Sequence, residues 1–340
     1  MTAVPGRTGG GPAVLALLRA REVGLLVLIA VVVLITTVKN SHFVEANSVQ
    51  QMLSGAALFA LLGVGETLVI ITRNVDLSVG SVLGLAAYVV GYLFKYHHIP
   101  VWSGFLIGTL IGAAAGLVNG LIVTVLRVPS LVVTLGMLYV IRGIDGVIVN
   151  GDQIDPASIP NSFTAVGYRT FLGVPWLAII VAVVVAGAGY AMRSFRSSRE
   201  LYAIGSNPDA AALAGIPIGR RVFSAFLISG TLAGLAGSLF LALHTQINNN
   251  GGVGYELIVV TAVVVGGVAI FGGSGSVVGA ALGALLLNVI NQALVAARIS
   301  AFWNQAIAGA LLLTAIAFDR WLSLRVTRSL QSAEGAHHEL

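Results

Sequence analysis

The acidic side chains are the first candidates for chemistry in this sequence of 340 residues, because only 13 Asp and Glu residues are present. Glu66 lies inside an apolar segment, Asp76 lies in a short polar interruption, and Glu256 begins a later apolar segment. A carboxyl group in apolar surroundings is costly, and ion-driven transporters and proton pumps use such groups. Glu66 is therefore a candidate for gating or coupling, and a hydrogen bond between neighbouring helices is the structural alternative.

A second group of polar residues lies in segment 72–81, which leads into the next apolar run. It contains Arg73, Asn74, Asp76 and Ser78 within six residues. The free N–H groups at the start of a helix bind side-chain acceptors, so Asp76 and Ser78 are candidate caps. Together with Arg73 and Asn74, they could also form a hinge in a membrane or a contact with a partner.

Several catalytic and metal-binding patterns are absent from the sequence. It has no Cys, so disulfides, thiolate metal sites and cysteine nucleophiles are excluded. The phosphate-binding pattern Gly-x4-Gly-Lys-Ser/Thr needs a Lys, and the only two, Lys39 and Lys95, lie in other contexts. The zinc pattern His-Glu-x-x-His is also missing. We therefore expect no catalytic site, no metal site and no cofactor bound by this chain.

The composition places these few polar groups in a membrane protein. Charged residues make up 9% of the chain, against about a quarter in an ordinary soluble domain, and hydrophobic residues make up 57%. The apolar residues fall in runs of about 20, the length that a helix needs to cross hydrocarbon. This pattern is typical of an all-α multi-pass membrane protein and excludes a soluble enzyme. The net charge of +5 comes from basic residues between the apolar runs, which argues against nucleic-acid binding.

The apolar runs predict about ten transmembrane helices in one transmembrane domain, residues 23–318. Tails at 1–22 and 319–340 and an inner loop at 193–221 complete the chain. The polar interruptions 73–76 and 272–276 are either loops or breaks inside the membrane. The expected spans are 23–38, 52–72, 79–94, 101–126, 130–149, 172–192, 222–244, 255–271, 276–297 and 302–318.

The distribution of basic residues predicts the orientation, since Lys and Arg are retained on the cytoplasmic side. With the N-terminus inside, 13 of the 18 basic residues fall on the inner side, and five of these are Arg residues between positions 193 and 221. Both termini are therefore predicted to be cytoplasmic.

Glycine recurs every four residues in one of the apolar runs, at Gly108, Gly112, Gly116 and Gly120. Small residues at this spacing form a smooth stripe that lets two helix backbones approach closely. The stripe predicts a tightly packed bundle, with a pore-lining role as the alternative.

The inner loop contains the most informative pattern. Pro208 at a first turn, Asp209 near the positive end of the helix dipole, an Ala-rich turn and Gly215 near the end predict a short helix. This helix either closes the loop or is displayed as a docking element. The pattern Asp209-Ala210-Ala211-x-x-x-Gly215 resembles the Glu-Ala-Ala-x-x-x-Gly loop of ABC importer membrane subunits, with Asp in place of Glu.

Four ordered motifs carry a wider resemblance over about residues 50 to 320. They are 74–81, 128–136, the loop 202–215 and the Gly-rich stretch 266–276. With them, the chain resembles the permease subunits of ribose/xylose-type monosaccharide ABC importers. The segments 72–74 and 298–304 are most similar to the rhamnose and autoinducer-2 branch.

The resemblance implies an ABC importer permease fold in the bacterial inner membrane and a division of labour among subunits. An extracytoplasmic sugar-binding protein delivers the solute, and two permeases, identical or different, form the path. Two cytoplasmic ATPase subunits, which bind ATP and Mg, close and open this path. The implied ATPase-docking residues are Asn207, Pro208, Asp209, Ala210, Ala211 and Gly215. The candidate gating residues and family motif are Glu66, Arg73, Asn74, Asp76 and Ser78.

A path for a sugar needs side-chain amides and hydroxyls with little charge. Asn119, Thr134, Asn288, Asn291 and Gln292 are the candidates for this path. A hydrogen bond between helices is the alternative role of each.

We therefore expect a permease subunit that moves a small neutral sugar, such as rhamnose or ribose, with ATP hydrolysis on a separate subunit. Autoinducer-2 is the alternative solute for the same kind of protein. From another class, an ion-coupled secondary transporter or a channel would also fit Glu66 and the helix count. An intramembrane enzyme has the least support, since no set of nucleophile, base and metal ligands is evident.

Overall fold

The computed structural model describes residues 11–300, 303 and 305–317. The predicted C-terminal tail 319–340 and residues 1–10 of the predicted N-terminal tail lie outside these residues, as do positions 301, 302 and 304 of segment 298–304. Residues 11–22, expected in the tail, are the first part of a helix.

Eight helices of the described part are long and apolar enough to cross a membrane, which confirms an all-α multi-pass protein. The remaining two of the ten expected spans, 255–271 and 302–318, correspond to shorter apolar helices, α11 (Tyr255–Val265) and the helix Gln305–Ala317. The long helices are α1 (Gly11–Lys39), α2 (Ala46–Ile71), α3 (Val79–His97), α4 (Val101–Val125), α5 (Ser130–Val149), α7 (Trp176–Ser194), α10 (Ile218–His244) and α12 (Val277–Ala296).

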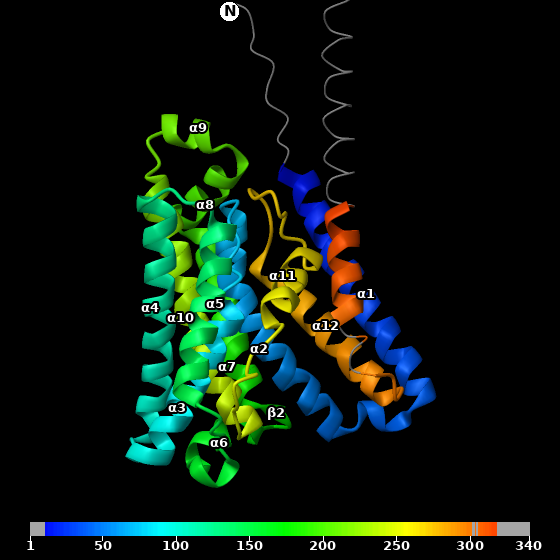
Figure 1. The fold of residues 1–340 in the computed structure, drawn as a ribbon. Coiled ribbons are helices and arrows are strands. Elements are labelled where there is room, and N and C mark those ends of the chain that lie inside the picture. Colours follow the sequence, from blue (N-terminus) through cyan, green and yellow to red (C-terminus); the bar gives the residue numbers. More distant parts are fainter. Residues whose placement is uncertain (1–10, 301–302, 304, 318–340) are drawn as a thin grey trace, which may run out of the picture.

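Short elements lie at the two ends of the bundle. The helices α8 (Arg196–Ser206) and α9 (Pro208–Leu213) stand at one end, the α8–α9 end (Figure 1). At the opposite end, the α6 end, lie α6 (Asn161–Tyr168) and a hairpin of β1 (Thr170–Phe171) and β2 (Val174–Pro175). The 3-10 turns η1 (Ser41–Val44) and η2 (Pro156–Ser158) complete the described elements.

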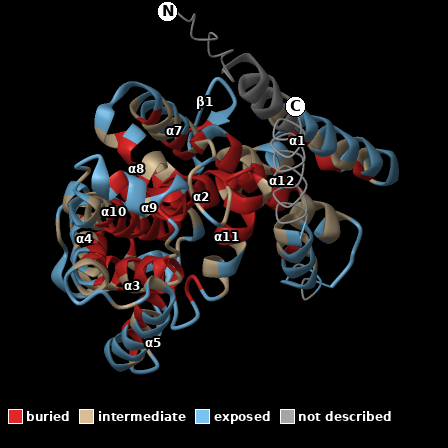
Figure 2. Ribbon diagram, turned by 90° about the horizontal axis from the view of Figure 1, so that it is seen from above, coloured by how far each residue is buried: buried red, intermediate tan, exposed pale blue. Residues whose placement is uncertain are grey.

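Helix α2 is the centre of the fold. In the most apolar 18-residue stretch of α2, 94% of the residues are buried. Figure 2 shows this helix among α7, α10, α11 and α12. Helices α1, α4 and α7 are exposed along much of their length, as expected of helices that face lipid. In the buried part of α2, the polar side chains of Ser54, Glu66 and Thr67 are therefore enclosed by protein.

The predicted tight packing of the glycine stripe is confirmed. Gly112 and Gly116 of α4 lie against Gly230 and Gly234 of α10, where a Cβ on any of the four would overlap the facing backbone. In a membrane, where apolar burial gives little drive between helices, such close approach supplies dispersion contacts. The stripe is therefore a helix–helix contact and not the lining of a pore.

Both polar interruptions are non-helical and partly buried segments. Segment 72–78 separates α2 from α3, and Thr72, Asp76 and Ser78 in it are buried. Segment 266–276 separates α11 from α12 and has positive φ angles at several glycines. Non-helical backbone at membrane depth must have its polar groups satisfied by protein neighbours.

Candidate functional site

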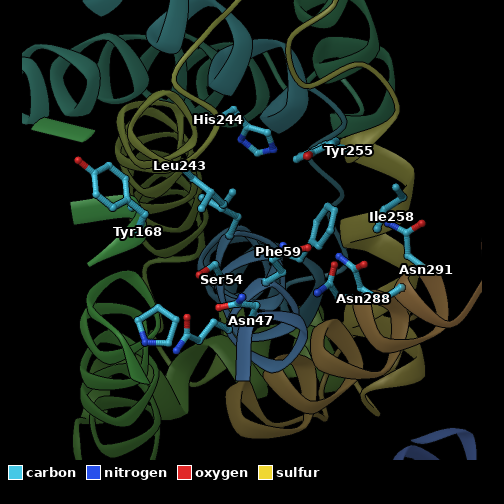
Figure 3. Close-up of a pocket in the computed structure, with 17 residues that line it drawn as sticks. Asn47, Ser54, Phe59, Tyr168, Leu243, His244, Tyr255, Ile258, Asn288 and Asn291 are labelled. Atoms are coloured by element: carbon cyan, nitrogen blue, oxygen red, sulfur yellow. The ribbon is translucent and has the colours of Figure 1, made fainter. Parts of the chain in front are cut away.

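A cavity of about 510 Å³ lies toward the α6 end, between α2, α10, α11 and α12 (Figure 3). This volume falls in the range of small-molecule sites. Its lining residues are Asn47, Gln50, Gln51, Ser54, Gly55, Leu58, Phe59, Gly167, Tyr168, Pro175, Leu243, His244, Tyr255, Ile258, Asn288, Asn291 and Gln292.

Side-chain amides from two helices line the cavity. Three of them, Asn47, Gln50 and Gln51, come from α2, and Asn288, Asn291 and Gln292 come from α12. No Asp, Glu, Lys or Arg is among the lining residues. Amides both donate and accept hydrogen bonds without carrying charge, so this lining suits a solute rich in hydroxyl groups.

Asn288 also holds the two helices together. Its Nδ2 donates to the Met52 carbonyl at 2.6 Å, and a Cβ on Gly55 would lie 2.8 Å from its Oδ1. The side chain is 3% exposed. Asn288 is thus a fixed part of the wall, whereas the amides of Asn291 and Gln292 are more accessible.

Aromatic side chains also line the cavity. The Phe59 and Tyr255 ring centroids lie 4.8 Å apart, and His244 stacks on Phe240 at 4.0 Å. Figure 3 shows Phe59 next to Asn288, and His244 and Tyr255 on the other side of the opening. Ring faces beside amides provide an apolar surface next to hydrogen-bonding groups, as in sites that hold compact polyhydroxy ligands.

The five path residues expected from sequence divide into two groups. Asn288, Asn291 and Gln292 line the cavity together, while Asn119 and Thr134 lie at the break between α2 and α3. The Asn119 Nδ2 donates to Ser78 Oγ at 2.8 Å, and Thr134 Oγ1 donates to the Val75 carbonyl at 3.2 Å. Both side chains are buried and bridge helices, so the structure does not place them at the cavity.

The break between α2 and α3 holds a buried polar cluster. The Asp76 backbone N–H donates to Glu66 Oε1 at 3.1 Å, and Asp76 Oδ1 accepts from the N–H and the hydroxyl of Ser78. Ser229 of α10 donates to Asp76 Oδ2 at 3.3 Å. Glu66 is fully buried, and its Oε2 has no hydrogen-bond partner. The predicted candidates Glu66, Asp76 and Ser78 are therefore brought together around the non-helical turn.

Arg73 leaves this break and reaches the end of α8. Its Nε donates to the Gly205 carbonyl at 2.6 Å, and its NH2 donates to the Ser206 carbonyl at 2.8 Å. A guanidinium at the C-terminus of a helix satisfies free carbonyls and complements the negative end of the helix dipole. Asn74 bonds locally, donating to the carbonyl of Thr72 at 2.9 Å.

The second break, 266–276, meets the same end of α8. Tyr202 donates its hydroxyl to the Gly275 carbonyl at 3.0 Å, and the Gly273 N–H donates to the Ile71 carbonyl at 2.9 Å. Gly205 sits between them so closely that a Cβ there would overlap Ile71 and Gly273. The last turn of α8 thus contacts both breaks, a connection that sequence motifs far apart in the chain do not reveal.

Helix α9 matches the short helix expected from Pro208 and Gly215. Asn207 is its N-cap, and its Oδ1 accepts from the Ala210 N–H at 3.0 Å. Gly215 follows it with φ +75°, a conformation that favours glycine. Asp209 and Ala210 are exposed, Ala211 is buried, and Leu213 is 92% exposed. Helix α9 thus presents an exposed leucine and an exposed acid on its outer surface.

Glu200 of α8 forms two ion pairs, one with Arg221 of α10 and one with Arg196 of α8 itself. Glu200 accepts from Arg221 Nε at 2.6 Å and from Arg196 Nε at 2.9 Å. The Arg221 guanidinium and then Arg196 hold the pKa of the Glu200 carboxyl below its usual value. The position of α8 is therefore fixed by charge on one side and by the breaks on the other.

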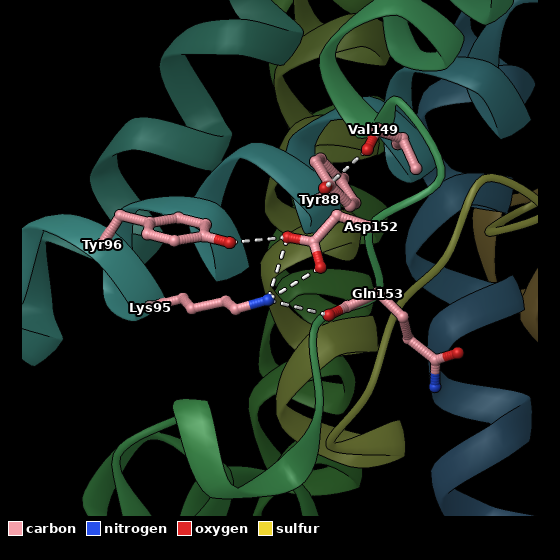
Figure 4. Close-up of polar contacts among 6 residues, drawn as sticks. All are labelled: Tyr88, Lys95, Tyr96, Val149, Asp152 and Gln153. Atoms are coloured by element: carbon pink, nitrogen blue, oxygen red, sulfur yellow. Dashed lines mark hydrogen bonds and ion pairs between the residues drawn. The ribbon is translucent and has the colours of Figure 1, made fainter.

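An ion-pair cluster ties two segments together at the α6 end (Figure 4). Lys95 Nζ bonds both oxygens of Asp152, at 2.8 and 2.9 Å, and the Tyr96 hydroxyl donates to Asp152 at 2.9 Å. The hydrogen bond from Lys95 lowers the pKa of Asp152. This cluster ties the end of α3 to the segment after α5, and it lies outside the cavity lining.

Sequence reasoning missed several lining residues. Asn47, Gln50 and Gln51 lie before the expected start of the second span at residue 52, and Phe59 and Tyr255 carry no motif. The close spacing of three amides at the start of an apolar helix is the signal that could have identified the first group. Within the described residues, the structure has no group of three or more His, Cys, Asp or Glu residues arranged to hold a metal ion.

Comparisons with known proteins extend over most of the chain. Residues 48–316 match the family described as "Branched-chain amino acid transport system / permease component". The autoinducer 2 import system permease protein LsrC of Klebsiella pneumoniae subsp. pneumoniae is 34% identical over 312 residues, which are 92% of this chain and 90% of that protein. The proteins of the same name from Enterobacter sp. and Escherichia coli are 35% and 33% identical, with the same coverage.

No solved structure matches the chain. The family match and the relatives confirm the resemblance expected from the motifs, including its nearest branch, that of rhamnose and autoinducer-2. They agree with a transport role and with the eight membrane-spanning helices. The chain therefore belongs to this family of ABC importer permease components, as a multi-pass protein of the inner membrane.

Proposed function

We propose that this chain is the permease subunit of an ATP-driven importer for a small, neutral, polyhydroxy solute, either autoinducer-2 or a monosaccharide such as rhamnose or ribose. The observation that carries the proposal is the cavity lined by amides and aromatic rings with no Asp, Glu, Lys or Arg. The names of the relatives, autoinducer 2 import permeases, support the same solute class.

The cavity argues against an amino acid, the solute class in the family's description. A free amino acid carries an ammonium and a carboxylate at neutral pH, and each is costly to bury without a partner of opposite charge. The lining residues offer no such partner. A solute with hydroxyl groups is matched directly by Asn291, Gln292 and the α2 amides.

The α9 helix and its flanks are the proposed docking surface for a separate ATPase subunit, which binds ATP and Mg. Asn207 and Pro208 begin the helix, Asp209 and Ala210 are exposed on it, and Gly215 ends the turn that follows. The buried Ala211 keeps the helix attached to the bundle. This division leaves the chain itself without a catalytic role.

A movement of α9 would be transmitted through α8 to the two non-helical breaks, segments 72–78 and 266–276. Arg73 binds the last carbonyls of α8, and Tyr202 binds the second break, so a shift of α8 pulls on both breaks at once. The buried cluster of Glu66, Asp76 and Ser78 lies beyond Arg73 on the same turn. We assign Arg73 the role of a positioning residue and this cluster the role of the hinge.

The remaining partners follow from the importer class. An extracytoplasmic binding protein delivers the solute to the α6 end, and a second permease, identical or different, completes the path. The predicted orientation, with both termini in the cytoplasm, places α9 on the side of the ATPase and the cavity toward the binding protein.

Competition during uptake tests the solute class. The transporter, reconstituted with its ATPase and binding protein, takes up a labelled solute while unlabelled autoinducer-2, rhamnose, ribose or leucine is added. We expect competition from one of the polyhydroxy solutes and none from leucine. Competition by leucine alone would show that the cavity serves an amino acid and would overturn the proposal.

A further inference from the structure

The turn between α10 and α11, residues 245–254, contributes to the solute cavity through the residues at its two ends. His244 lies directly before the turn and Tyr255 directly after it, and both line the cavity. Figure 3 shows these two side chains on the same side of the opening. The position of the 245–254 turn therefore determines where two ring side chains of the cavity stand.

The 245–254 turn packs against the backbone of α3 at two glycines. A Cβ on Gly80 would lie 2.7 Å from the Gly252 carbonyl oxygen, and a Cβ on Gly84 would overlap the Gly251 carbonyl oxygen. Gly251 and Gly252 are themselves buried, and Gly252 has φ +69°, a conformation that favours glycine. Two α3 glycines one helical turn apart thus form a notch that receives the turn.

Arg142 of α5 holds the turn in this notch. Its NH1 donates to the Gly251 carbonyl oxygen at 2.6 Å, and a Cβ on Gly84 would lie 3.1 Å from the same nitrogen. The guanidinium therefore lies where α3, α5 and the turn meet. A hydrogen bond from a charged donor is stronger than one between neutral groups, so this contact is a firm attachment of the turn to α5.

Two acids keep Arg142 in this place. Arg142 interacts electrostatically with Asp145, one turn further along α5, and with Glu256 in the first turn of α11. Asp145 is 1% exposed, and within the described residues neither of its carboxyl oxygens has a hydrogen-bond partner. A buried carboxylate without a nearby cation is strongly destabilising, so the positive charge of Arg142 is needed there. Glu256 also accepts from the Gly254 N–H at 3.2 Å, directly before Tyr255.

On the basis of the proposed function, we infer that Arg142 is a positioning residue for solute recognition. Arg142 is not among the residues that line the cavity. Through the Gly251 carbonyl it fixes the 245–254 turn, and through the turn it fixes Tyr255, whose ring centroid lies 4.8 Å from that of Phe59. Arg142 thus raises the affinity for the solute without touching it. The structural alternative is a cation that only neutralises the two acids.

The mobility of the turn tests whether Arg142 holds it. Because the chain has no cysteine, Val253→Cys carries a single nitroxide spin label at an exposed position of the turn. In the reconstituted permease we expect a broad electron paramagnetic resonance line with Arg142, a narrow one in Arg142→Gln, and a broad one in Arg142→Lys, which keeps a charged donor. A label on Leu172→Cys, exposed in the β1–β2 hairpin, should not respond. An unchanged line at position 253 in Arg142→Gln would overturn the inference.

The solute dependence of uptake tests whether the position of the turn matters for recognition. With the ATPase and the binding protein present, Arg142→Gln should raise the half-saturating solute concentration about tenfold and leave uptake per ATP hydrolysed unchanged. Gly84→Ala keeps every charge but pushes Gly251 out of the notch, and it should have the same effect even where Arg142→Gln fails to fold. Gly136→Ala, with no neighbour within 4 Å, and Arg127→Gln, at an exposed residue, are the matched controls and should behave as the wild type.

A double variant separates positioning from charge neutralisation. If Arg142 acts through the ring of Tyr255, then Arg142→Gln should weaken solute affinity little further in a Tyr255→Leu background. Losses of affinity that multiply in the double variant would overturn the inference, as would a lower maximal rate at an unchanged half-saturating concentration. Wild-type uptake that no polyhydroxy solute inhibits would instead refute the proposed function, and the spin-label result would still decide whether Arg142 holds the turn.

Discussion

The two ends of this bundle differ in the groups that they present. The cavity toward the α6 end is lined by amides and aromatic rings and has no formally charged Asp, Glu, Lys or Arg in its lining. The α8–α9 end has arginines, the doubly paired Glu200 and helix carbonyls bound by Arg73. Uncharged groups recognise a neutral solute without a large desolvation cost, whereas charge-assisted hydrogen bonds hold moving elements firmly. We therefore propose that the α6 end recognises the solute and that the α8–α9 end couples the permease to its ATPase.

The largest effect is expected from Gly215→Pro at the α8–α9 end. Proline fixes φ near −65°, whereas Gly215 has φ +75° and donates its N–H to the Ala212 carbonyl. The turn after α9 must therefore change, and uptake and ATPase stimulation should both be abolished. Gly151→Pro is the matched control, since Gly151 also has a positive φ with no neighbour within 4 Å. Normal uptake in Gly215→Pro would remove α9 from the coupling path.

Arg73→Gln should have the next largest effect. It removes two hydrogen bonds from a charged donor, each worth about 1.5–3 kcal/mol, so that α8 can move without the break between α2 and α3. We expect uptake per ATP hydrolysed to fall roughly tenfold, with ATPase binding unchanged. Arg73→Lys keeps the charge but not the two-nitrogen geometry and should be intermediate. Equal coupling in the wild type and Arg73→Gln would contradict the role of a positioning residue.

Asn291→Leu probes the other side of the comparison. Loss of one neutral hydrogen bond costs about 1 kcal/mol, so the half-saturating solute concentration should rise about fivefold, while ATPase stimulation stays normal. Asn161→Leu makes the same change at an exposed residue of α6 outside this cavity and should have no effect. If Asn291→Leu changed coupling and left solute affinity intact, recognition and coupling would not be divided between the ends.

The smallest effect concerns pH and Glu200. Its pKa is lowered in the folded protein by Arg221 and Arg196, so the stabilising pair is complete at neutral pH and is lost as the pH falls through the lowered pKa. Acidification below the ordinary range of Glu should therefore lower the thermal midpoint of the wild type more than that of Glu200→Gln. Parallel pH profiles of the two proteins would show that this pair contributes nothing to stability.

Sequence alone predicted the membrane-spanning class, most span positions, the short helix at Pro208 and the family. These features depend on local properties, namely apolar run length, capping residues and glycine spacing. The junction of Arg73 with Gly205 and Ser206 could not be predicted, because it joins residues about 130 positions apart through tertiary packing.

The candidate path was predicted only in part for the same reason. Asn288, Asn291 and Gln292 lie one helical turn or less apart and line one cavity, whereas Asn119 and Thr134 serve the break. An amide in an apolar helix has the same sequence signal in either role, and only its neighbours decide between them. The α11 span was expected to be longer because the apolar run continues into glycines 266 and 267, where the helix ends.

The driving force for uptake tests the central claim most directly. Proteoliposomes that contain the permease, with or without its ATPase and binding protein, are supplied with either ATP or an ion gradient, and entry of labelled solute is measured. We expect accumulation only when ATP, the ATPase and the binding protein are present together. Accumulation driven by an ion gradient through the permease alone, with Glu66 required, would contradict it and identify an ion-coupled transporter.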